Sequence, residues 1–467
     1  MSMALKPCNL WEERWKGLKT MKYEFPDNFI WGVATAAQQI EGGMRDGGRG
    51  LSNWDVFSHI PGTIEGGGVP DTACDSYHNL ERDVEKLKEL GVNSYRFSFS
   101  WPRIIPDGTG DVNPEGIAYY RKLLTLLKEN GIVPNATMFH WDLPYALQVK
   151  GGFGNRKMIE WFLNYANVLL DNFGEDIKYW VTFNEPIATY VGNAKGFFAP
   201  GLSDDAYARQ CCHNLLVCHG ETVKLFRSKG FRDSKIGIVV DVWKHYPADA
   251  DNEEDVMSAM LANETEGYGM FLHPLFIGGY SDYLNEYMTQ NGVMPEILPG
   301  DFETIRQPVD FYGMNFYNVL IDDTEKQRRL AEEHGGGGNY QNRPEYHTEL
   351  LGRVLREIIE EYRIDVPLFI SENGIPQVGL TDRESILDDQ ERIEYVEKVL
   401  KMLHGAIQDG IDVRGYYLWS LMDNFEWSAG YEHRFGLYYT DFDTLELIPK
   451  KSAGWYADVI SNNGLGE

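Results

Sequence analysis

The 467-residue chain is 43% hydrophobic and 13% aromatic, a composition typical of a globular protein that excludes extensive disorder. Its formal charge of −28 argues against nucleic acid or an anionic membrane surface as a partner. No apolar run approaches the ~20 residues that a membrane-spanning helix needs.

The N-terminal residues 1–24 are expected to form an extension before a single domain spanning residues 25–467. This extension lacks the uninterrupted apolar segment of a signal peptide. The five cysteines are an odd number without the spacing of a disulfide framework, which suits a reducing compartment. We therefore expect a cytoplasmic protein.

From Phe29 onward, short apolar segments alternate with longer amphipathic stretches, and the alternation recurs eight times. Most of the short segments lack polar alternation, which is typical of parallel strands covered on both faces. The predicted strands are 29–37, 94–101, 132–140, 179–185, 236–243, 310–317, 367–372 and 413–421.

The stretches between these segments have the 3.6-residue period of helices. One carries apolar residues from Ile117 to Leu127 and ends at Gly131, and another runs from Ile393 to Ile407 and ends before Gly410. Eight strand and helix units in one chain predict a closed (β/α)8 TIM barrel, an α/β fold, with elaborated loops at the carboxyl ends of its strands. The glycine run 335–338 is expected to be a solvent loop after the sixth strand.

Two other clusters invite a metal or nucleotide interpretation. Cys211, Cys212 and Cys218, with their neighbouring histidines, lie in a helical pattern over 206–226, which favours a packed helix over a metal or redox site because no C-x-x-C pair is present. The glycines of 42–50 open no helix at G-x-G-x-x-G spacing, so a phosphate cradle is the weaker interpretation.

The fourth and seventh predicted strands each end in an acid. Glu185 closes the run 180–186, where Pro186 stops the strand, and Glu372 closes the run 367–374, where Gly374 does so. Since the reactive groups of such a barrel lie at the carboxyl ends of its strands, we expect the two carboxyls to face each other across one mouth.

Polar and aromatic residues end most of the other strands as well. We expect them to converge on the same mouth: Gln39, Glu41, Arg96, His140, Trp141, Asp142, Asn184, Asn315, Tyr317, Trp419, Glu426 and Trp427.

A pair of carboxyls among tryptophan, amide and histidine side chains suits the cleavage of a sugar acetal. One acid must be protonated to assist the leaving oxygen, and the other must be ionised to attack the anomeric carbon. Tryptophan faces stack on a pyranose while amides and carboxylates bind its hydroxyls. Either acid alone is more often a helix cap or an ion-pair partner, so the interpretation depends on their joint occurrence.

These stretches resemble family 1 glycoside hydrolases, the β-glucosidase and β-galactosidase group, over nearly the whole chain from about residue 25 to 460. The resemblance is carried by the segments 182–186 (TFNEP), 370–374 (ISENG), 29–42, 95–98, 139–144, 419–427, 434–439 and 451–455, all in the order of that family. Ser371 stands where threonine is more usual.

The resemblance implies a role for each matching residue. Glu185 is the expected acid/base and Glu372 the expected nucleophile, with Arg96, Asn315 and Tyr317 completing the catalytic group. The expected sugar-binding residues are Gln39, His140, Trp141, Asn184, Trp419, Glu426, Trp427 and Phe435. Asn184 holds the 2-hydroxyl in this scheme, and Gln39 and Glu426 bind the 3-, 4- and 6-hydroxyls.

Two positions depart from the family pattern. Gln38 stands where tyrosine or phenylalanine is frequent, and Phe316 replaces the first tyrosine of the usual Asn-Tyr-Tyr. Neither residue carries the chemistry, so we expect local repacking only.

The expected function is that of a retaining, exo-acting β-glycosidase, most simply a β-glucosidase that also accepts galactosyl or fucosyl residues. It predicts the two carboxyls ~5–5.5 Å apart, whereas inversion needs ~6.5–9.5 Å. No metal or cofactor is expected, and the expected partner is a small β-glycoside or oligosaccharide. The alternatives are a 6-phospho-β-glycosidase, which Glu426 and Trp427 oppose by charge and bulk, a transglycosylating enzyme, and a non-catalytic sugar-binding relative.

Overall fold

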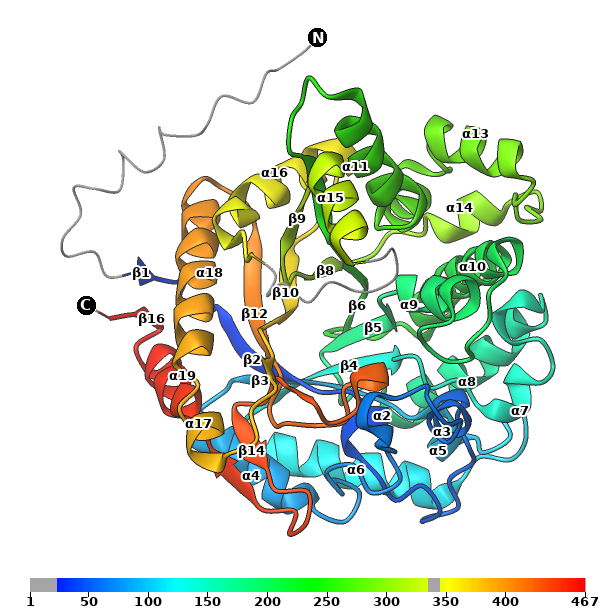
Figure 1. Ribbon diagram of the computed structural model, residues 1–467. Coiled ribbons are helices and arrows are strands. Elements are labelled where there is room, and N and C mark those ends of the chain that lie inside the picture. The colour runs from blue at the N-terminus through cyan, green and yellow to red at the C-terminus, as the bar shows by residue number, and fades with distance from the viewer. Residues whose placement is uncertain (1–22, 335–344, 467) are drawn as a thin grey trace.

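A closed barrel of eight parallel strands organises the molecule, and the surrounding helices form an outer ring (Figure 1). The computed structural model describes residues 23–334 and 345–466. Around the barrel the strands follow the order β2 (Ile30–Ala34), β3 (Ser94–Ser98), β4 (Val133–Phe139), β5 (Tyr179–Asn184), β6 (Lys235–Asp241), β8 (Phe311–Asn315), β10 (Leu368–Asn373) and β12 (Val413–Trp419).

The longer helices return the chain from the end of one strand to the start of the next. They are α4 (Leu80–Leu90), α6 (Pro114–Glu129), α8 (Met158–Phe173), α10 (Asp205–Lys229), α11 (Glu253–Thr265), α13 (Asp282–Asn291), α15 (Thr324–His334), α16 (Leu351–Tyr362), α18 (Gln390–Gln408) and α19 (Lys451–Ser461). Shorter helices lie in the connections: α2 (Ala37–Ile40), α3 (Asn53–Ser58), α5 (Trp101–Ile104), α7 (Tyr145–Gln148), α9 (Ile187–Tyr190), α12 (Gly269–Leu272), α14 (Asp301–Ile305) and α17 (Arg383–Leu387).

Small two-stranded sheets lie outside the barrel. They pair β1 (Tyr23–Glu24) with β16 (Gly464–Leu465), β7 (Lys244–Pro247) with β9 (Val319–Asp322), β11 (Gln377–Val378) with β13 (His433–Arg434), and β14 (Tyr438–Thr440) with β15 (Leu447–Pro449). The first of these holds the two ends of the described chain together.

All the predicted strands are confirmed, and so is the barrel, but seven of the eight predicted strands extend too far at their carboxyl ends, the exception being β10. The first was predicted to reach residue 37 and ends at Ala34, and the second was predicted to reach 101 and ends at Ser98. The residues beyond each end turn into the mouth of the barrel, where apolar composition continues without strand pairing. The two predicted helices are α6 and α18.

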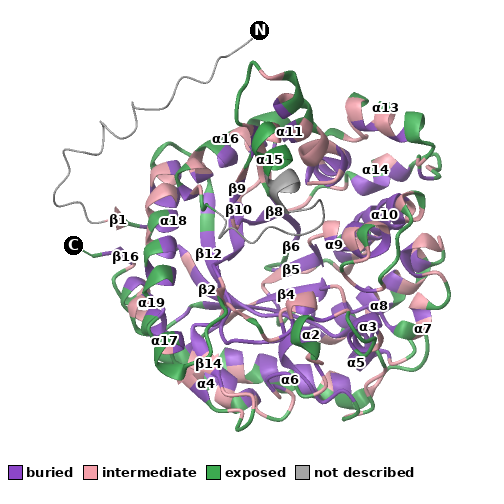
Figure 2. Ribbon diagram, viewed as in Figure 1, coloured by how far each residue is buried: buried purple, intermediate pink, exposed green. Residues whose placement is uncertain are grey.

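Two apolar cores hold the barrel together, one between the strands and the helices and one inside the barrel. Most residues of the barrel strands are buried (Figure 2). The inner core includes Val181, Val239 and Phe369 and continues upward into Trp419 and Trp427. The aromatic residues of the mouth are therefore the upper layer of the barrel's own packing.

The cysteine cluster lies on α10, as the helical pattern predicted. Cys211, Cys212 and Cys218 are free and buried, and burial raises the pKa of the Cys211 thiol to about 12. The glycine run 335–338 and nearly all of the predicted N-terminal extension lie outside the described residues. Within the described part of the chain, no helix combines the length and apolarity that crossing a membrane requires.

Candidate active site

The two predicted acids lie at one end of the barrel and line a single cavity of about 690 Å³. Glu185 directly follows β5, and Glu372 lies near the end of β10. The other sequence-predicted residues that line this cavity are His140, Trp141, Tyr317, Trp419, Glu426, Trp427 and Phe435. Gln39, Arg96, Asn184 and Asn315 are buried and bond to residues of this lining.

Glu372 is held by a donor on each carboxyl oxygen. Arg96, which is 1% exposed in β3, donates from Nη1 to Glu372 Oε1 at 2.5 Å, and the Tyr317 hydroxyl donates to Oε2 at 2.7 Å. A buried arginine paired with a carboxylate is a strong, charge-assisted contact. Glu372 is therefore fixed in orientation, and the Arg96 guanidinium lies where it offsets negative charge on this carboxyl.

Glu185 has a different environment. Its backbone φ is +44°, a left-handed conformation that is costly for a residue with a side chain and that concentrates at functional sites. Asn315 donates to Glu185 Oε1 at 2.6 Å. Burial, followed by the nearby charges of Asp241 and Glu372, raises the pKa of Glu185 well above its ordinary value, although Asn315 and Arg96 oppose this. Glu185 is thus suited to hold a proton at neutral pH.

Asn184 joins the two carboxyls through one amide. Its Oδ1 accepts from Arg96 Nη2 at 2.6 Å and from Asn315 Nδ2 at 3.1 Å, so the partners of Glu372 and Glu185 converge on it. Its Nδ2 lies 3.0 Å from His140 Nε2. Burial and the Arg96 charge hold the pKa of His140 well below its usual range, so this ring is neutral.

Aromatic rings form one wall of the cavity. The His140 ring is nearly parallel to those of Trp419 and Trp427, at interplanar angles of 24° and 17°. Trp141 contacts Trp427 with ring centroids 4.4 Å apart and donates from its ring N–H to the Asn184 carbonyl at 2.9 Å. Phe435 meets Tyr317 edge-on. Such a wall offers flat apolar faces for the C–H groups of a sugar.

Gln39 and Glu426 form the polar side. Gln39 donates to Glu426 Oε2 at 3.1 Å and to the Phe425 carbonyl at 3.0 Å, and its own carbonyl oxygen is buried without a partner among the described residues. Burial and then the Glu372 charge raise the pKa of Glu426 to about 8. An unmet acceptor beside a buried carboxyl is suited to hydroxyl donors of a ligand.

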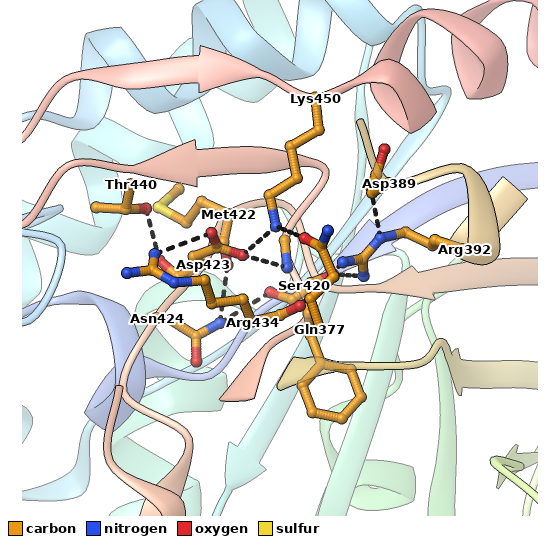
Figure 3. A network of polar contacts seen from close by, with 12 residues as sticks. Gln377, Asp389, Arg392, Ser420, Met422, Asp423, Asn424, Arg434, Thr440 and Lys450 are labelled. Carbon is orange, nitrogen blue, oxygen red and sulfur yellow. Dashed lines mark hydrogen bonds and ion pairs between the residues drawn. The ribbon is translucent and has the colours of Figure 1, made fainter. Parts of the chain in front are cut away.

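A network of buried charges fixes the segment that carries Glu426 (Figure 3). Asp423 accepts from Lys450 Nζ at 2.7 Å and from Arg434 at 3.2 Å. Asn424 bonds to the Ser420 hydroxyl at 3.1 Å and accepts from Gln39 at 3.0 Å. Lys450 is 2% exposed. The polar side of the cavity is therefore anchored from behind by ion pairs.

Arg392 anchors the same segment from α18. It pairs with Asp389 at 2.8 Å and donates to the backbone carbonyls of Ile375, Arg434 and Phe435 (Figure 3). These bonds fix the backbone on both sides of Phe435.

Gly374 is required by close approach. A Cβ at this position would lie 2.2 Å from the Trp419 carbonyl oxygen. The glycine that ends the Glu372 motif therefore lets β10 pass directly against the end of β12.

Glu41 and Asp142 do not join the cavity, in contrast to the prediction for the strand ends. Glu41 pairs with the buried Arg103 at 2.7 Å and accepts from Tyr120 at 2.5 Å. Asp142 is fully buried and does not line the cavity. The turn at α2 points Gln39 and Glu41 in different directions, which strand alternation could not reveal.

Other residues line the cavity that were not predicted from the sequence. Asp241 ends β6 and Trp243 follows that strand, whereas Phe198 and Tyr346 come from long connections. A polar residue at the end of the fifth strand was a readable signal for Asp241. Phe198 and Tyr346 carried no signal, because the course of a long connection is not encoded in local periodicity.

Hydrogen bonds with three neighbouring side chains accommodate the polar residue Gln38 in its buried position. Gln38 is buried, donates to Asp55 at 2.8 Å and accepts from Arg49 at 2.9 Å and Ser52 at 3.0 Å. Phe316 is fully buried and donates its backbone N–H to the Glu372 carbonyl at 3.0 Å.

One group of side chains among the described residues has the geometry of a possible cation site. Glu264, His273 and Glu361 bring three potential ligand atoms within 4.8 Å of one another. The Lys244 ammonium lies 3.6 Å from Glu361 and already supplies positive charge there. None of the three ligands lines the cavity.

Comparison with known proteins places the chain among sugar-cleaving enzymes. The sequence profile described as glycosyl hydrolase family 1 matches residues 21–465. The 1,4-beta-D-glucan glucohydrolase of Thermotoga neapolitana is 40% identical over 95% of this chain and 99% of that protein. Beta-glucosidase A of Acetivibrio thermocellus is 40% identical over the same shares. The solved structure of the family 1 β-glucosidase from Thermotoga maritima superposes with a TM-score of 0.87 at 38% identity, covering 96% of this chain and all of that one.

Proposed function

The chain belongs to glycosyl hydrolase family 1, and we propose that it is a retaining, exo-acting β-glucosidase that removes terminal β-D-glucosyl residues. The observation that carries the proposal is the pair of carboxyls lining one cavity in unlike environments. Glu372 is paired with the Arg96 cation and hydrogen-bonded by Tyr317, whereas the pKa of Glu185 is raised by burial and by neighbouring negative charge. Two acids with opposite protonation are what a double displacement needs.

In the first step, Glu372 attacks the anomeric carbon and forms a glycosyl ester. Glu185 transfers its proton to the leaving oxygen as the glycosidic bond breaks. Tyr317 donates to one Glu372 oxygen and Arg96 to the other, so they orient the attacking group. Asn315 orients Glu185 through its 2.6 Å bond.

In the second step, Glu185 is ionised and removes a proton from water, which attacks the anomeric carbon and releases Glu372. Two inversions leave the sugar with its β configuration. The same intermediate also accepts an alcohol or sugar in place of water, which is the transglycosylating alternative. Product analysis at high substrate concentration separates the two outcomes.

The sugar lies against the aromatic wall of His140, Trp419 and Trp427 in this proposal. Asn184 binds the 2-hydroxyl, while the unmet Gln39 carbonyl and the Glu426 carboxyl bind hydroxyls on the opposite edge. Glu426 opposes a 6-phosphorylated sugar because two negative groups would then share a buried site. A neutral glucoside is the better substrate.

Azide rescue tests the assignment of the two acids. Glu372→Gly should lose hydrolysis of an aryl β-glucoside, and azide should then give an α-glucosyl azide. Glu185→Gly, the matched variant, should give a β-glucosyl azide from an activated aryl glucoside, because its nucleophile is intact. Exchange of the two products would reverse the roles. Absence of any activity in the parent enzyme, together with sugar binding, would support the non-catalytic alternative.

We also propose that the enzyme acts in the cytoplasm on small β-glycosides or oligosaccharides. The free and buried Cys74, Cys211, Cys212 and Cys218 support this, since a reducing compartment keeps such thiols unpaired. Rates on a panel of aryl β-glucosides, galactosides and fucosides, with cellobiose, would define the preferred sugar.

A further inference from the structure

A third carboxyl lies beside the two catalytic acids and has no assigned step in the scheme above. Asp241 ends β6, lines the same cavity as Glu185 and Glu372, and is 7% exposed. No ion pair joins it to a cation among the residues that the structure describes, and its Oδ1 has no hydrogen-bond partner there. A buried, unpaired carboxyl is costly, so its presence in a cavity calls for a function.

The strand register places Asp241 next to the catalytic acids. Asp241 pairs with Asn315 across β6 and β8, and Asn315 pairs with Glu372 across β8 and β10. The three residues therefore form one row across neighbouring strands that are ~4.8 Å apart. Asn315 bonds to Glu185, whose backbone N–H donates to the Val239 carbonyl of β6 at 2.9 Å. Asn315 therefore links the two acids, since it pairs with Asp241 in the strand register and hydrogen-bonds to Glu185.

We propose that Asp241 is a positioning residue for proton transfer, whose negative charge keeps the proton on Glu185 and thereby sets the upper pH limit of the first step. The inference rests on the proposed roles of Glu185 and Glu372. Two like charges in one buried site disfavour each other, so once one carboxyl is ionised the other holds its own proton more tightly. The same charge makes Glu185 a stronger base in the second step.

The directions in which the pKa values of Asp241 and Glu185 are shifted agree with this geometry. Burial, and then the Glu372 charge, raise the pKa of Asp241 to about 7, against a backbone hydrogen bond that lowers it. Asp241 is also the largest charged contributor to the raised pKa of Glu185. Carboxyls coupled in this way release their protons in two steps that belong to the pair.

Other charged and titratable groups face the same cavity from the surrounding elements. Those that line it are His140 after β4, His245 on β7, Glu266 and Tyr268 after α11, Tyr317 after β8, Tyr346 before α16, Glu372 on β10, Glu426 after β12 and His433 on β13, and Arg96 on β3 lies behind Glu372. Arg96 lowers the pKa of Glu185, whereas Glu372 raises it. All of them remain in place when only Asp241 is changed, so the comparison isolates its charge.

The experiment is the pH profile of kcat/KM for the parent and for Asp241→Asn, which has the same shape without the charge. The basic limb reports the acid of the free enzyme, so it should move to lower pH by roughly one unit in Asp241→Asn. Asp241→Glu keeps the charge and should restore the parent limb. Phenyl β-glucoside is the test substrate, because its leaving group needs a proton.

Two controls separate this effect from a structural one. With 2,4-dinitrophenyl β-glucoside the leaving group needs no proton, so the basic limb should be absent or unmoved in every variant. Asp233→Asn makes the same charge change at an exposed position before β6, at the other end of that strand, and should leave the limb in place.

The inference is overturned if kcat/KM of Asp241→Asn falls equally at every pH, or if its basic limb stays in place or moves upward. Either result would leave Asp241 with a packing or hydrogen-bonding role. Failure of the proposed function has a different signature, because the parent itself would then not cleave either substrate.

Discussion

The buried pair of Glu41 and Arg103 gives a sharp test of how the structure departs from the sequence pattern. The prediction put Glu41 at the mouth, whereas the structure pairs it with Arg103, which is 0% exposed. Burial alone would lower the pKa of Arg103, but the Glu41 charge and nearby tyrosines outweigh it and raise the pKa. Replacing Arg103 with methionine keeps much of the side chain's volume and leaves Glu41 with the Tyr120 hydroxyl as its remaining side-chain donor.

The expected magnitude follows from the burial of both partners. Removing one member of a buried pair costs about 3–5 kcal/mol because the other charge is left uncompensated. A chain of 467 residues has an unfolding entropy of about 1 kcal/mol/K, at ~2.1 cal/mol/K per residue. The Tm should therefore fall by roughly 3–5 °C. The double variant Glu41→Gln/Arg103→Met removes the stranded charge and should recover most of that loss.

Calorimetry of the parent, both single variants and the double variant completes a double-mutant cycle. The kcat on an aryl β-glucoside at 25 °C should stay within roughly threefold of the parent, ~0.6 kcal/mol, since Glu41 does not line the cavity. A Glu41→Gln variant that folds normally but loses kcat by a factor of hundreds would refute the reasoning. That result would favour the prediction that Glu41 lies at the mouth of the barrel. A Tm of Arg103→Met equal to that of the parent would refute the energetic argument.

Three further predictions concern the cavity. Tyr317→Phe removes the 2.7 Å bond to Glu372 and should lower kcat by about 10–150-fold, the equivalent of ~1.5–3 kcal/mol for a bond to a charged group; an unchanged kcat in steady-state assays would show that Arg96 alone orients Glu372. Gly374→Ala forces a Cβ to within 2.2 Å of the Trp419 carbonyl oxygen and should lower the free energy of unfolding by about 1–3 kcal/mol in denaturant titrations, with a matching loss of activity; wild-type stability would mean that β10 and β12 separate easily. Glu426→Ser should raise KM for glucosides and narrow the preference over 6-phosphoglucosides, measured as a ratio of kcat/KM values, whereas an unchanged ratio would exclude Glu426 as the group that repels phosphate.

The barrel could be predicted from the sequence because its signal is redundant. Eight apolar segments separated by amphipathic stretches specify one closed sheet even when individual boundaries are wrong by several residues. Boundaries failed at the carboxyl ends, as between Ala34 and Ala37, because residues that pack in the mouth are as apolar as those in the strand. The apolar composition of these residues predicts that they are buried, but it does not predict which of them pair with a neighbouring strand.

The site could be predicted only as far as each residue followed a strand directly. Glu185 and Glu372 sit at strand ends, so the topology alone brings them to one mouth. Asp241 ends its strand in the same way and was overlooked, although the same rule would have found it. Glu41 was misplaced because a short helix, α2, separates it from its strand.

The outer part of the cavity could not be predicted from local sequence patterns, as two of its aromatic residues show. Trp243, which is 41% exposed, stacks on Tyr317 with an interplanar angle of 13°, so an exposed ring continues the catalytic row outward. Phe198, which is partly buried, stacks on Trp141 with an interplanar angle of 30°. Each ring is placed by a connection whose course depends on long-range packing. The part of the cavity around Glu185 and Glu372 is therefore built on strand ends and can be predicted from the sequence, whereas its outer part is built on connections. In the proposed function, substrate preference beyond the first sugar should accordingly change with these two rings while the chemistry of Glu185 and Glu372 stays the same.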